Sequence, residues 1–375
     1  MQSKTISSDD PANFYRPDAV FVEQSAKDYP LTQKILSSLP HVPVHEIQNV
    51  ERVEKQFKSS RADVFGEGKK NLVLSRFNGS FLKKCPGASP GMVCCNYYVV
   101  NLSKNCLYDC SYCFLQDFLK NNPLQVAYVN VEDLIQELED VFTEFPDRIF
   151  RVGTGEIADS LALDFLIPYS QFLIPFFNLQ KNAVLELKTK SDCVENLLNQ
   201  PDPTNVIVSW SINPQEIIDR EEKGTPNLEK RLHAASLCVE KGYRVGFHLD
   251  PIILIAGWEK AYRELVDVLF DFIPASSMEW VSLGSFRYRS SLKPIIKSRH
   301  PETMLFTGEH LPSKDGKYRY LRPLRNRAYE TIRGFLQDKS KELSIYMCME
   351  TKEVWKDVTG NTPRSDEKLD AFFDL

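Results

Sequence analysis

The sequence predicts an α/β fold organised around a parallel sheet, and two observations carry that prediction. Beyond residue 97, short runs rich in β-branched and aromatic residues alternate with amphipathic helical patterns. Such alternation is typical of βαβ units, whose strands run parallel. The chain has 375 residues, enough for one large domain or two. Ligands of parallel α/β folds bind at the carboxyl ends of the strands, so residues just beyond each expected strand are candidate site residues.

The expected elements follow one another along the chain. Strands are expected over residues 97–102, 148–152, 183–187, 206–212, 243–249 and 280–283. Helices are expected over residues 131–145, 161–177, 193–198, 228–241 and 258–272, and prolines interrupt the second of them. In the first helix, apolar residues recur at helical spacing on one face: Val131, Leu134, Leu138, Val141 and Phe142. Nearer the N-terminus, a helix is expected within 21–39 and a short strand and turn within 42–53.

Composition and charge bound the possible functions. The apolar fraction of 42% and the charged fraction of 26% are typical of a water-soluble globular protein. The formal net charge of −5 gives no global signature of nucleic-acid binding, although it does not exclude a local basic groove. The N-terminus lacks a basic-then-apolar signal sequence, and polar residues and prolines interrupt the longest apolar run, 161–179. We therefore expect a cytoplasmic protein with no membrane partner.

The cysteines do not form the pattern of a disulfide framework. They are Cys85, Cys94, Cys95, Cys106, Cys110, Cys113, Cys193, Cys238 and Cys348. Their number is odd and most of them gather in one third of the chain, which favours reduced thiols in a reducing compartment. The adjacent pair Cys94 and Cys95 lacks a complete ligand set, so local packing is favoured over a second metal or redox site.

Three cysteines, Cys106, Cys110 and Cys113, follow the first expected strand with the spacing C-x3-C-x2-C. Short spacers of this kind let one loop wrap around a metal centre. Structural zinc sites and ordinary iron–sulfur clusters take four protein ligands, so three thiolates leave one metal position open for a substrate or cofactor. Independent buried thiols and a zinc knuckle are the alternatives. A zinc knuckle needs a fourth ligand, and His233 and His248 lie far along the chain outside any paired motif.

This motif resembles that of the radical S-adenosylmethionine superfamily, and within it that of the spore photoproduct lyase family of DNA-repair enzymes. Tyr112, Phe114 and Gln116 stand where that family carries aromatic residues and a glutamine. The resemblance implies a [4Fe-4S] cluster on the three motif cysteines, whose open iron binds S-adenosylmethionine. One electron, from a reductant such as flavodoxin or ferredoxin, then releases a 5′-deoxyadenosyl radical. We take Tyr112 as a candidate catalytic residue and Phe114 as a candidate cofactor contact.

The resemblance also implies the architecture. The fold is expected to be a partial (β/α)6 TIM-like barrel with extensions at both ends. The barrel is expected over residues 91–290, after an irregular and partly helical N-terminal extension over 1–90. A basic C-terminal extension is expected over 291–375.

Residues beyond the second expected strand form the element Gly153-Thr-Gly155-Glu156. Glycines let the backbone approach a ligand closely, and the glutamate adds a carboxylate. The element resembles the Gly-Gly-Glu of the superfamily, which binds the ammonium group of S-adenosylmethionine. A glycine turn with a solvated glutamate is the alternative. Asp159 beyond it is equally able to cap a following helix.

The next three strand ends supply further candidates. Lys190 and Ser211 follow the third and fourth strands, at positions where the family contacts the cofactor. A solvated lysine and a hydroxyl with backbone partners are the alternatives. His248 and Asp250 alternate on one face of the fifth strand, so both are able to point into the barrel mouth. We expect His248 near the cofactor, with a core histidine paired to Asp250 as the alternative.

The region from Lys293 to Arg327 is the most basic part of the chain. It interleaves cations with aromatic residues, which suits phosphates and unstacked bases. The spore photoproduct lyase family has a DNA-contacting hairpin in this region, so nucleic-acid contacts are expected from Lys317, Arg319, Tyr320 and Arg322. A charged surface hairpin is the alternative, because acidic residues dilute the charge.

One position departs from the family. Spore photoproduct lyases carry a cysteine shortly after the second strand, which returns a hydrogen atom to the product radical, and by spacing that position is Glu156 here. A carboxylic O–H is a far poorer hydrogen-atom donor than a thiol. Cys348, in a strand-like segment near the C-terminus, is our candidate donor, and a buried core thiol is the alternative.

The predicted function is therefore that of a radical S-adenosylmethionine lyase resembling spore photoproduct lyase, with thymine photoproducts in DNA as the first substrate class. One alternative is radical chemistry on a protein, an RNA or a small molecule. Another is a metal- or cluster-binding nucleic-acid module without turnover.

Overall fold

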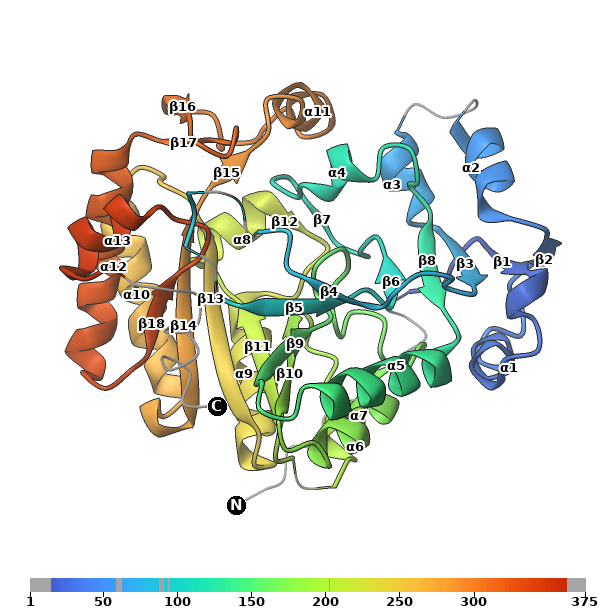
Figure 1. Ribbon diagram of the computed structural model, residues 1–375. Helices are drawn as coiled ribbons and strands as arrows, with labels where there is room; N and C mark the ends of the chain where they lie inside the picture. The colour runs from blue at the N-terminus through green and yellow to red at the C-terminus, as the bar shows by residue number, and fades with distance from the viewer. Residues whose placement is uncertain are drawn as a thin grey trace, which may run out of the picture.

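The computed structural model describes residues 15–58, 63–87, 89, 91–93, 95–201 and 203–362 (Figure 1). Cys94 lies outside the described residues, so the interpretation of the Cys94–Cys95 pair stays a prediction. A sheet of eight strands and a sheet of five strands organise the described chain.

The eight-stranded sheet has the order β18-β14-β13-β11-β10-β9-β5-β4. Its strands are β4 (Leu82–Lys84), β5 (Tyr97–Val100), β9 (Phe150–Gly153), β10 (Ala183–Thr189), β11 (Val206–Ser211), β13 (Arg244–Ile252), β14 (Met278–Ser285) and β18 (Ile345–Met347). From β5 to β14 neighbouring strands pair in parallel, as the alternation of strands and helices predicted. The sheet curls into a half barrel (Figure 1), which confirms the predicted partial barrel. Strand β18 adds a parallel edge and β4 an antiparallel one.

Helices cover the outer face of the half barrel (Figure 1). They are α5 (Val131–Glu144), α6 (Ser170–Asn178), α7 (Glu195–Leu198), α9 (Leu228–Glu240) and α10 (Trp258–Phe272), while the short α8 (Gln215–Glu221) follows β11. Helix α5 buries Val131, Leu134, Leu138 and Phe142, so its predicted apolar face is confirmed. Strands covered in this way are buried along their length, which explains their apolar sequences.

The helix expected over 161–177 is shorter in the structure, because α6 begins only at Ser170. Pro168 disfavours a helical conformation in the residue before it, and residues 161–169 form bends and turns instead. The buried carboxylate of Asp164 accepts hydrogen bonds from the backbone N of Ser170 at 3.0 Å and from its hydroxyl at 2.5 Å. Asp164 thereby satisfies donors at the start of the helix.

The five-stranded sheet has the order β2-β1-β3-β8-β6 and lies beside the half barrel (Figure 1). Its strands are β1 (Ala19–Glu23), β2 (Val44–Ile47), β3 (Asn71–Ser75), β6 (Ser103–Lys104) and β8 (Gln125–Tyr128), and α1 (Pro30–Ser37), α2 (Val50–Lys58) and α3 (Val64–Gly68) connect the first of them. The helix expected within 21–39 is correct only in its second half, where α1 lies. β1 takes the first half, with Val20 and Val22 buried on alternate positions. Strands β3, β6 and β8 were not predicted.

Strands β6 and β8 come from the part of the sequence assigned to the barrel, and they pair in one sheet with the N-terminal strands. The predicted N-terminal extension is therefore joined to the segment that carries the cysteine motif. The division at residues 90 and 290 stays a prediction.

The C-terminal region begins with α11 and a small antiparallel sheet and returns to the half barrel through β18. Its elements are β15 (Arg287–Tyr288), α11 (Leu292–Arg299), β16 (His310–Pro312), β17 (Tyr318–Tyr320), α12 (Arg322–Lys339) and α13 (Lys352–Thr359). Among the helices of the described ranges, none is long and apolar enough to cross a membrane.

Two glycines provide a matched test of this packing. Gly246 lies in β13, where an added Cβ would sit 2.7 Å from the indole nitrogen of buried Trp280. Gly334 lies inside α12, where nothing in the described chain comes within 4 Å of an added Cβ. We expect Gly246→Ala to destabilise the fold by about 1–3 kcal/mol through overpacking. Gly334→Ala should stabilise it by roughly 0.5–1 kcal/mol because alanine favours the helix. Urea unfolding measures both, and equal midpoints would contradict the tight contact at Trp280.

Candidate active site

The three motif cysteines lie on residues 105–116, which we call the cysteine loop. It runs from β6 to α4 (Leu115–Phe118) and contains the short strand β7 (Asp109–Cys110). β7 pairs antiparallel with β12 (Glu222–Lys223), which puts Cys110 opposite Glu222. The backbone N of Cys113 donates to the carbonyl O of Cys110 at 3.1 Å, so the chain turns tightly between these two cysteines. The motif forms one compact loop, as its spacing predicted.

The donor atoms of this loop suit an iron–sulfur cluster. Cys106 and Cys113 pack against a small apolar group. The members of that group are Phe65, Leu115, Leu119 and Ile157. Burial raises the pKa of the Cys106 thiol to about 12, and Lys69 opposes the rise. A bound metal ion would offset the free-energy cost of deprotonating this buried thiol, because cysteine binds metals as the thiolate. In the described part of the chain, no group of three or more His, Cys, Asp or Glu side chains is placed to hold a metal ion, so cluster binding stays a proposal.

Tyr112, which precedes the third cysteine, is held by a buried carboxylate. Its hydroxyl donates to Glu222, which also accepts from the side-chain amide of Asn213 at 3.0 Å. Arg231 donates to the second oxygen of Glu222 at 2.6 Å and to the carbonyl O of Ser211 at 2.9 Å. The side chains of Arg231 and Glu222 are both fully buried. This pair therefore connects the cysteine loop to the end of β11.

Lys190 lies in the same neighbourhood, with its ammonium 5.6 Å from the centre of the Tyr112 ring. Burial lowers the pKa of Lys190, but Glu222, Cys110 and Asp159 together outweigh burial and raise the pKa above its ordinary value. Burial likewise raises the pKa of Glu222, but Arg231 and Lys190 hold it below its ordinary value. The structure thus brings the predicted Tyr112, Lys190 and Ser211 together around two residues that sequence reasoning missed.

The loop after β9 carries the predicted Gly153, Gly155 and Glu156. An added Cβ on Gly153 would lie 1.5 Å from the Tyr97 hydroxyl, so packing against Tyr97 accounts for this glycine without a ligand. An added Cβ on Gly155 would approach the backbone of β10 to 3.0 Å. The Glu156 carboxylate accepts a hydrogen bond from the side-chain amide of Asn101 at 2.8 Å and is only partly buried. Of the three residues, Glu156 presents a charged group at the surface of the loop.

Asp159 joins this loop to the end of β10. Its carboxylate accepts from the Thr189 hydroxyl at 2.6 Å and from the backbone N of Lys190 at 2.7 Å. It also accepts from the backbone N of Leu161 and Ala162, at 3.0 and 2.9 Å, but these residues form a turn, so the predicted helix cap is wrong. The Asp159 carboxylate therefore connects the loop that carries Glu156 to the end of β10 that carries Lys190.

His248 lies inside the half barrel, and its expected contact with the cofactor stays a prediction. Its Nδ1 lies 2.5 Å from the Ser282 hydroxyl, and its Nε2 lies 2.7 Å from Glu186 and 3.1 Å from the Ser209 hydroxyl. Both ring nitrogens therefore already have buried partners. The alternative, a buried core histidine, agrees with these contacts, but its carboxylate partner is Glu186 rather than Asp250.

Asp250 instead pairs with Arg287, whose two terminal nitrogens donate to its oxygens at 2.9 and 3.0 Å. Cys348 lies within electrostatic reach of this pair and of Lys188. Its backbone N donates to the carbonyl O of Leu283 at 2.9 Å, which continues the pairing of β18 with β14. Burial, and then the Asp250 carboxylate, raise the pKa of the Cys348 thiol to about 11. Cys348 is thus a protonated, half-buried thiol at the carboxyl end of the edge strand.

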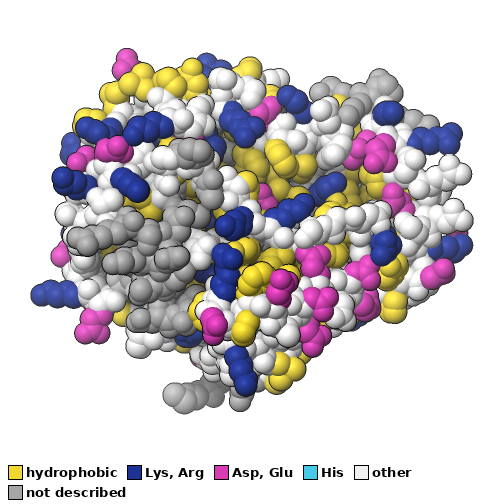
Figure 2. All heavy atoms as spheres, viewed as in Figure 1, with side chains coloured by type: hydrophobic (Ala, Val, Ile, Leu, Met, Phe, Trp, Pro, Cys, Tyr) yellow, Lys and Arg dark blue, Asp and Glu magenta, His cyan; other side chains and the backbone are white. Residues whose placement is uncertain are grey.

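Two of the four residues expected to contact nucleic acid are not at the surface, which corrects the prediction. Arg319 is 1% exposed, because its guanidinium is bound by the two oxygens of Asp315 at 2.5 and 2.8 Å. Tyr320 is 5% exposed. Lys317 is half-buried, and Arg322 exposes 58% of its side chain. Figure 2 shows several Lys and Arg side chains around the hollow in the middle of this face, with Asp and Glu side chains grouped below and to the right of them.

Comparison with known proteins identifies the family. The sequence model described as spore photoproduct lyase matches residues 15–345. The chain belongs to the spore photoproduct lyase family. This confirms the predicted relationship and, because the relatives are radical S-adenosylmethionine lyases, the prediction of an enzyme of that kind.

Two curated spore photoproduct lyases illustrate the distance within the family. The protein of Bacillus subtilis (strain 168) is 26% identical over 298 residues, which cover 78% of this chain and 85% of that protein. The protein of Geobacillus sp. (strain Y412MC61) is 26% identical over 336 residues, which cover 85% and 95%. The match therefore extends over most of both proteins.

Solved structures of spore photoproduct lyase share the fold. A complex with dinucleoside spore photoproduct has a TM-score of 0.78 at 23% identity, covering 89% of this chain and 98% of that one. A mutant with bound AdoMet and dinucleoside spore photoproduct has a TM-score of 0.77 at 23% identity, covering 90% and 99%. The predicted fold class is confirmed.

The pH dependence of stability tests the buried position of His248. Burial lowers its pKa from 6.5 to about 4, against the opposing effect of Glu186. Between these values the unfolded chain binds a proton that the folded protein does not, so stability falls as the pH drops through this window. The loss from this group is about 3 kcal/mol. We expect His248→Gln to flatten the profile in urea unfolding across that window, and an unchanged slope would contradict the buried, neutral ring.

Proposed function

We propose that this family member holds a [4Fe-4S] cluster on Cys106, Cys110 and Cys113 and cleaves S-adenosylmethionine to a 5′-deoxyadenosyl radical. The observation that supports this most is the cysteine loop, because its three thiols come from one compact loop that leaves no fourth cysteine in the motif. The bound cluster would supply the electron for the cleavage, after reduction by a one-electron carrier such as flavodoxin or ferredoxin.

The candidate cofactor contacts lie on loops beside the cysteine loop. Glu156 offers a partly exposed carboxylate, which suits the ammonium of S-adenosylmethionine. Lys190 lies over the Tyr112 ring, and the carbonyl O of Ser211 binds Arg231. Phe114 leaves 49% of its surface exposed, enough for its ring to stack on a base. Two of the solved relatives were studied with AdoMet or with dinucleoside spore photoproduct, which supports this assignment.

The first proposed substrate class is a lesion in nucleic acid, with thymine photoproducts in DNA as its best-supported member. The names of the relatives favour it, and Arg322 and the half-buried Lys317 remain available for phosphates. Glu156 at the expected cysteine position favours a second candidate, radical chemistry on a different substrate such as a protein, an RNA or a small molecule. The cytoplasmic location of this chemistry is part of the proposal.

Substitution of one proposed cluster ligand tests the function. After anaerobic reconstitution and addition of dithionite and S-adenosylmethionine, we expect wild-type protein to form 5′-deoxyadenosine. Cys110→Ala should form none above background, because two thiolates do not hold the cluster. Cys238→Ala, a buried cysteine in α9, is the matched control and should retain the reaction.

Metal analysis of the same samples separates the alternatives. Zinc in place of iron would contradict the radical enzyme, and so would a full cluster that forms no 5′-deoxyadenosine. Either result would favour the alternative of a metal-binding module without turnover. Iron and sulfide with 5′-deoxyadenosine formation, both lost in Cys110→Ala, support the proposal.

Cys348 is the proposed hydrogen-atom donor. Its raised pKa keeps the S–H bond intact, and its neighbours Asp250 and Arg287 are polar groups at the barrel mouth. Donation breaks the S–H bond homolytically, so the hydrogen atom closes the substrate radical and leaves a thiyl radical on the sulfur. Cys348 would thereby replace the family cysteine as hydrogen-atom donor, a role for which the carboxyl group of Glu156 is poorly suited.

Solvent deuterium tests this donor, because a thiol proton exchanges with water whereas a carbon-bound hydrogen does not. In heavy water, with dinucleoside spore photoproduct as the substrate, we expect the wild-type product to carry deuterium. Cys348→Ala should still form 5′-deoxyadenosine but lose the label and shift the distribution of products. The Cys238→Ala control should match wild type. Unchanged labelling and product distribution in Cys348→Ala would remove Cys348 from the mechanism.

A further inference from the structure

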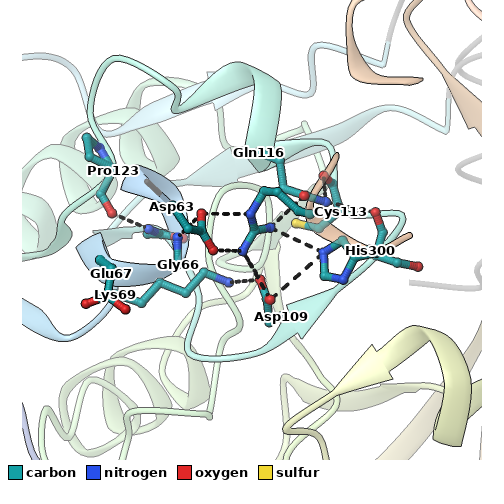
Figure 3. Close-up of polar contacts among 12 residues, drawn as sticks. Asp63, Gly66, Glu67, Lys69, Asp109, Cys113, Gln116, Pro123 and His300 are labelled. Carbon is teal, nitrogen blue, oxygen red and sulfur yellow. Dashed lines mark hydrogen bonds and ion pairs between the residues drawn. The ribbon is translucent and has the colours of Figure 1, made fainter. Parts of the chain in front are cut away.

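Arg299, the last residue of α11, bonds both to Asp63 and to the cysteine loop. Its Nε and Nη2 donate to the two oxygens of Asp63, at 2.9 and 3.0 Å. Its Nη2 also donates to both oxygens of Asp109, at 3.0 and 3.1 Å, and its Nη1 donates to Gln116 Oε1 at 2.6 Å. Asp63, Asp109 and Gln116 converge on one point (Figure 3). The side chain of Arg299 is only 11% exposed, so water competes weakly for these bonds.

Gln116 transmits this contact into the loop. Its side-chain nitrogen donates to the carbonyl oxygens of Cys110, Ser111 and Cys113, at 3.3, 2.8 and 3.2 Å. These carbonyls lie on the stretch between the second and third motif cysteines. Arginine has donors only, so its bond to Oε1 fixes the amide orientation and points the NH2 group at the three carbonyls. A flipped amide would face the guanidinium with its own donors and lose the backbone contacts.

A second cation and an aromatic ring complete the support on this side of the loop. Lys69 donates to the carbonyl O of Tyr108 and, at 3.1 Å, to Asp109 Oδ1. The Phe65 ring contacts both cations, with its centre 4.6 Å from Lys69 Nζ and 5.1 Å from the guanidinium carbon of Arg299. Phe65 also belongs to the apolar group on which two of the motif cysteines pack.

We propose that Arg299 is a positioning residue for the proposed cluster, acting through Gln116 on the backbone between Cys110 and Cys113. The inference rests on the proposed function, since it assigns a partner to the cluster ligands. Outer partners of metal ligands fix the ligand geometry, and their loss weakens the hold on the metal. A residue of the C-terminal region thereby controls how firmly a loop that lies far before it in the sequence holds its cluster.

Iron retention of reconstituted protein tests this role. Arg299→Met removes every donor of the guanidinium, whereas Gln116→Glu keeps a partner for Arg299 but removes the donors to the three carbonyls. Both variants should lose iron to a chelator about 10- to 100-fold faster than wild type. Arg327→Met is the matched control, because it removes an exposed arginine that pairs with Glu259 at 2.7 Å on the outside of the protein. Its iron should be retained as in wild type.

Two further measurements separate positioning from a general loss of structure. Loss of these partly buried contacts should lower the unfolding temperature of the apoprotein variants, but each should keep one cooperative transition above the assay temperature. The double variant Arg299→Met/Gln116→Glu should lose iron no faster than the worse single variant, because the two side chains act in series. Wild-type iron loss in Arg299→Met would overturn the inference and leave the cluster proposal intact. Wild-type protein that takes up no iron would overturn the cluster proposal itself. If Arg299→Met does not fold, Gln116→Glu decides on the same criteria.

Discussion

The fully buried ion pair between Glu222 and Arg231 is the interaction on which the site depends. Glu222 lies opposite Cys110 in the β7–β12 ladder and receives the hydroxyl of Tyr112. Arg231, from α9, reaches the end of β11 at the carbonyl of Ser211. Breaking a buried pair by removing one partner typically costs about 3–5 kcal/mol, because the remaining charge has lost its compensation. The Glu222–Arg231 pair thus connects the cysteine loop to the half barrel, and removal of either side chain would leave a buried charge without its partner.

The interior of the half barrel is polar at one level, where buried side chains of neighbouring strands bond to one another. Glu186 on β10 accepts from Arg151 at 2.9 Å and from the Ser209 hydroxyl at 2.7 Å, and it contacts His248. Arg151 and His248 are otherwise costly groups to bury, and the carboxylate compensates them. Through these contacts the network links the neighbouring strands β9, β10, β11 and β13 inside the sheet.

Local pattern predicted the six parallel strands and the cysteine loop, because periodicity and spacing are properties of short segments. It did not predict the roles of Glu222 and Arg299. Glu222 lies in a charged segment of the kind that is usually exposed to solvent, and the partners of Arg299 are at positions 63, 109 and 116. The same limit placed Arg319 on a nucleic-acid surface, although Asp315 holds it in the interior. Pairing between distant charges depends on topology, which a sequence pattern does not contain. The shortened α6 follows from Pro168, a signal that was present in the sequence.

Glu156 stands where the family has a cysteine, and the order of the strands shows how far the proposed donor Cys348 lies from that position. Glu156 follows β9, whereas Cys348 follows the edge strand β18, and four strands separate β9 from β18 in the sheet. In a curled sheet, those two strand ends lie on different sides of the mouth. On the proposed role of Cys348, a hydrogen atom would reach a bound radical from the β18 side, and the substrate would have to present its radical carbon toward that edge. The proposed donor thus constrains how the substrate lies, and a lesion bound in the opposite orientation receives no hydrogen atom from this thiol.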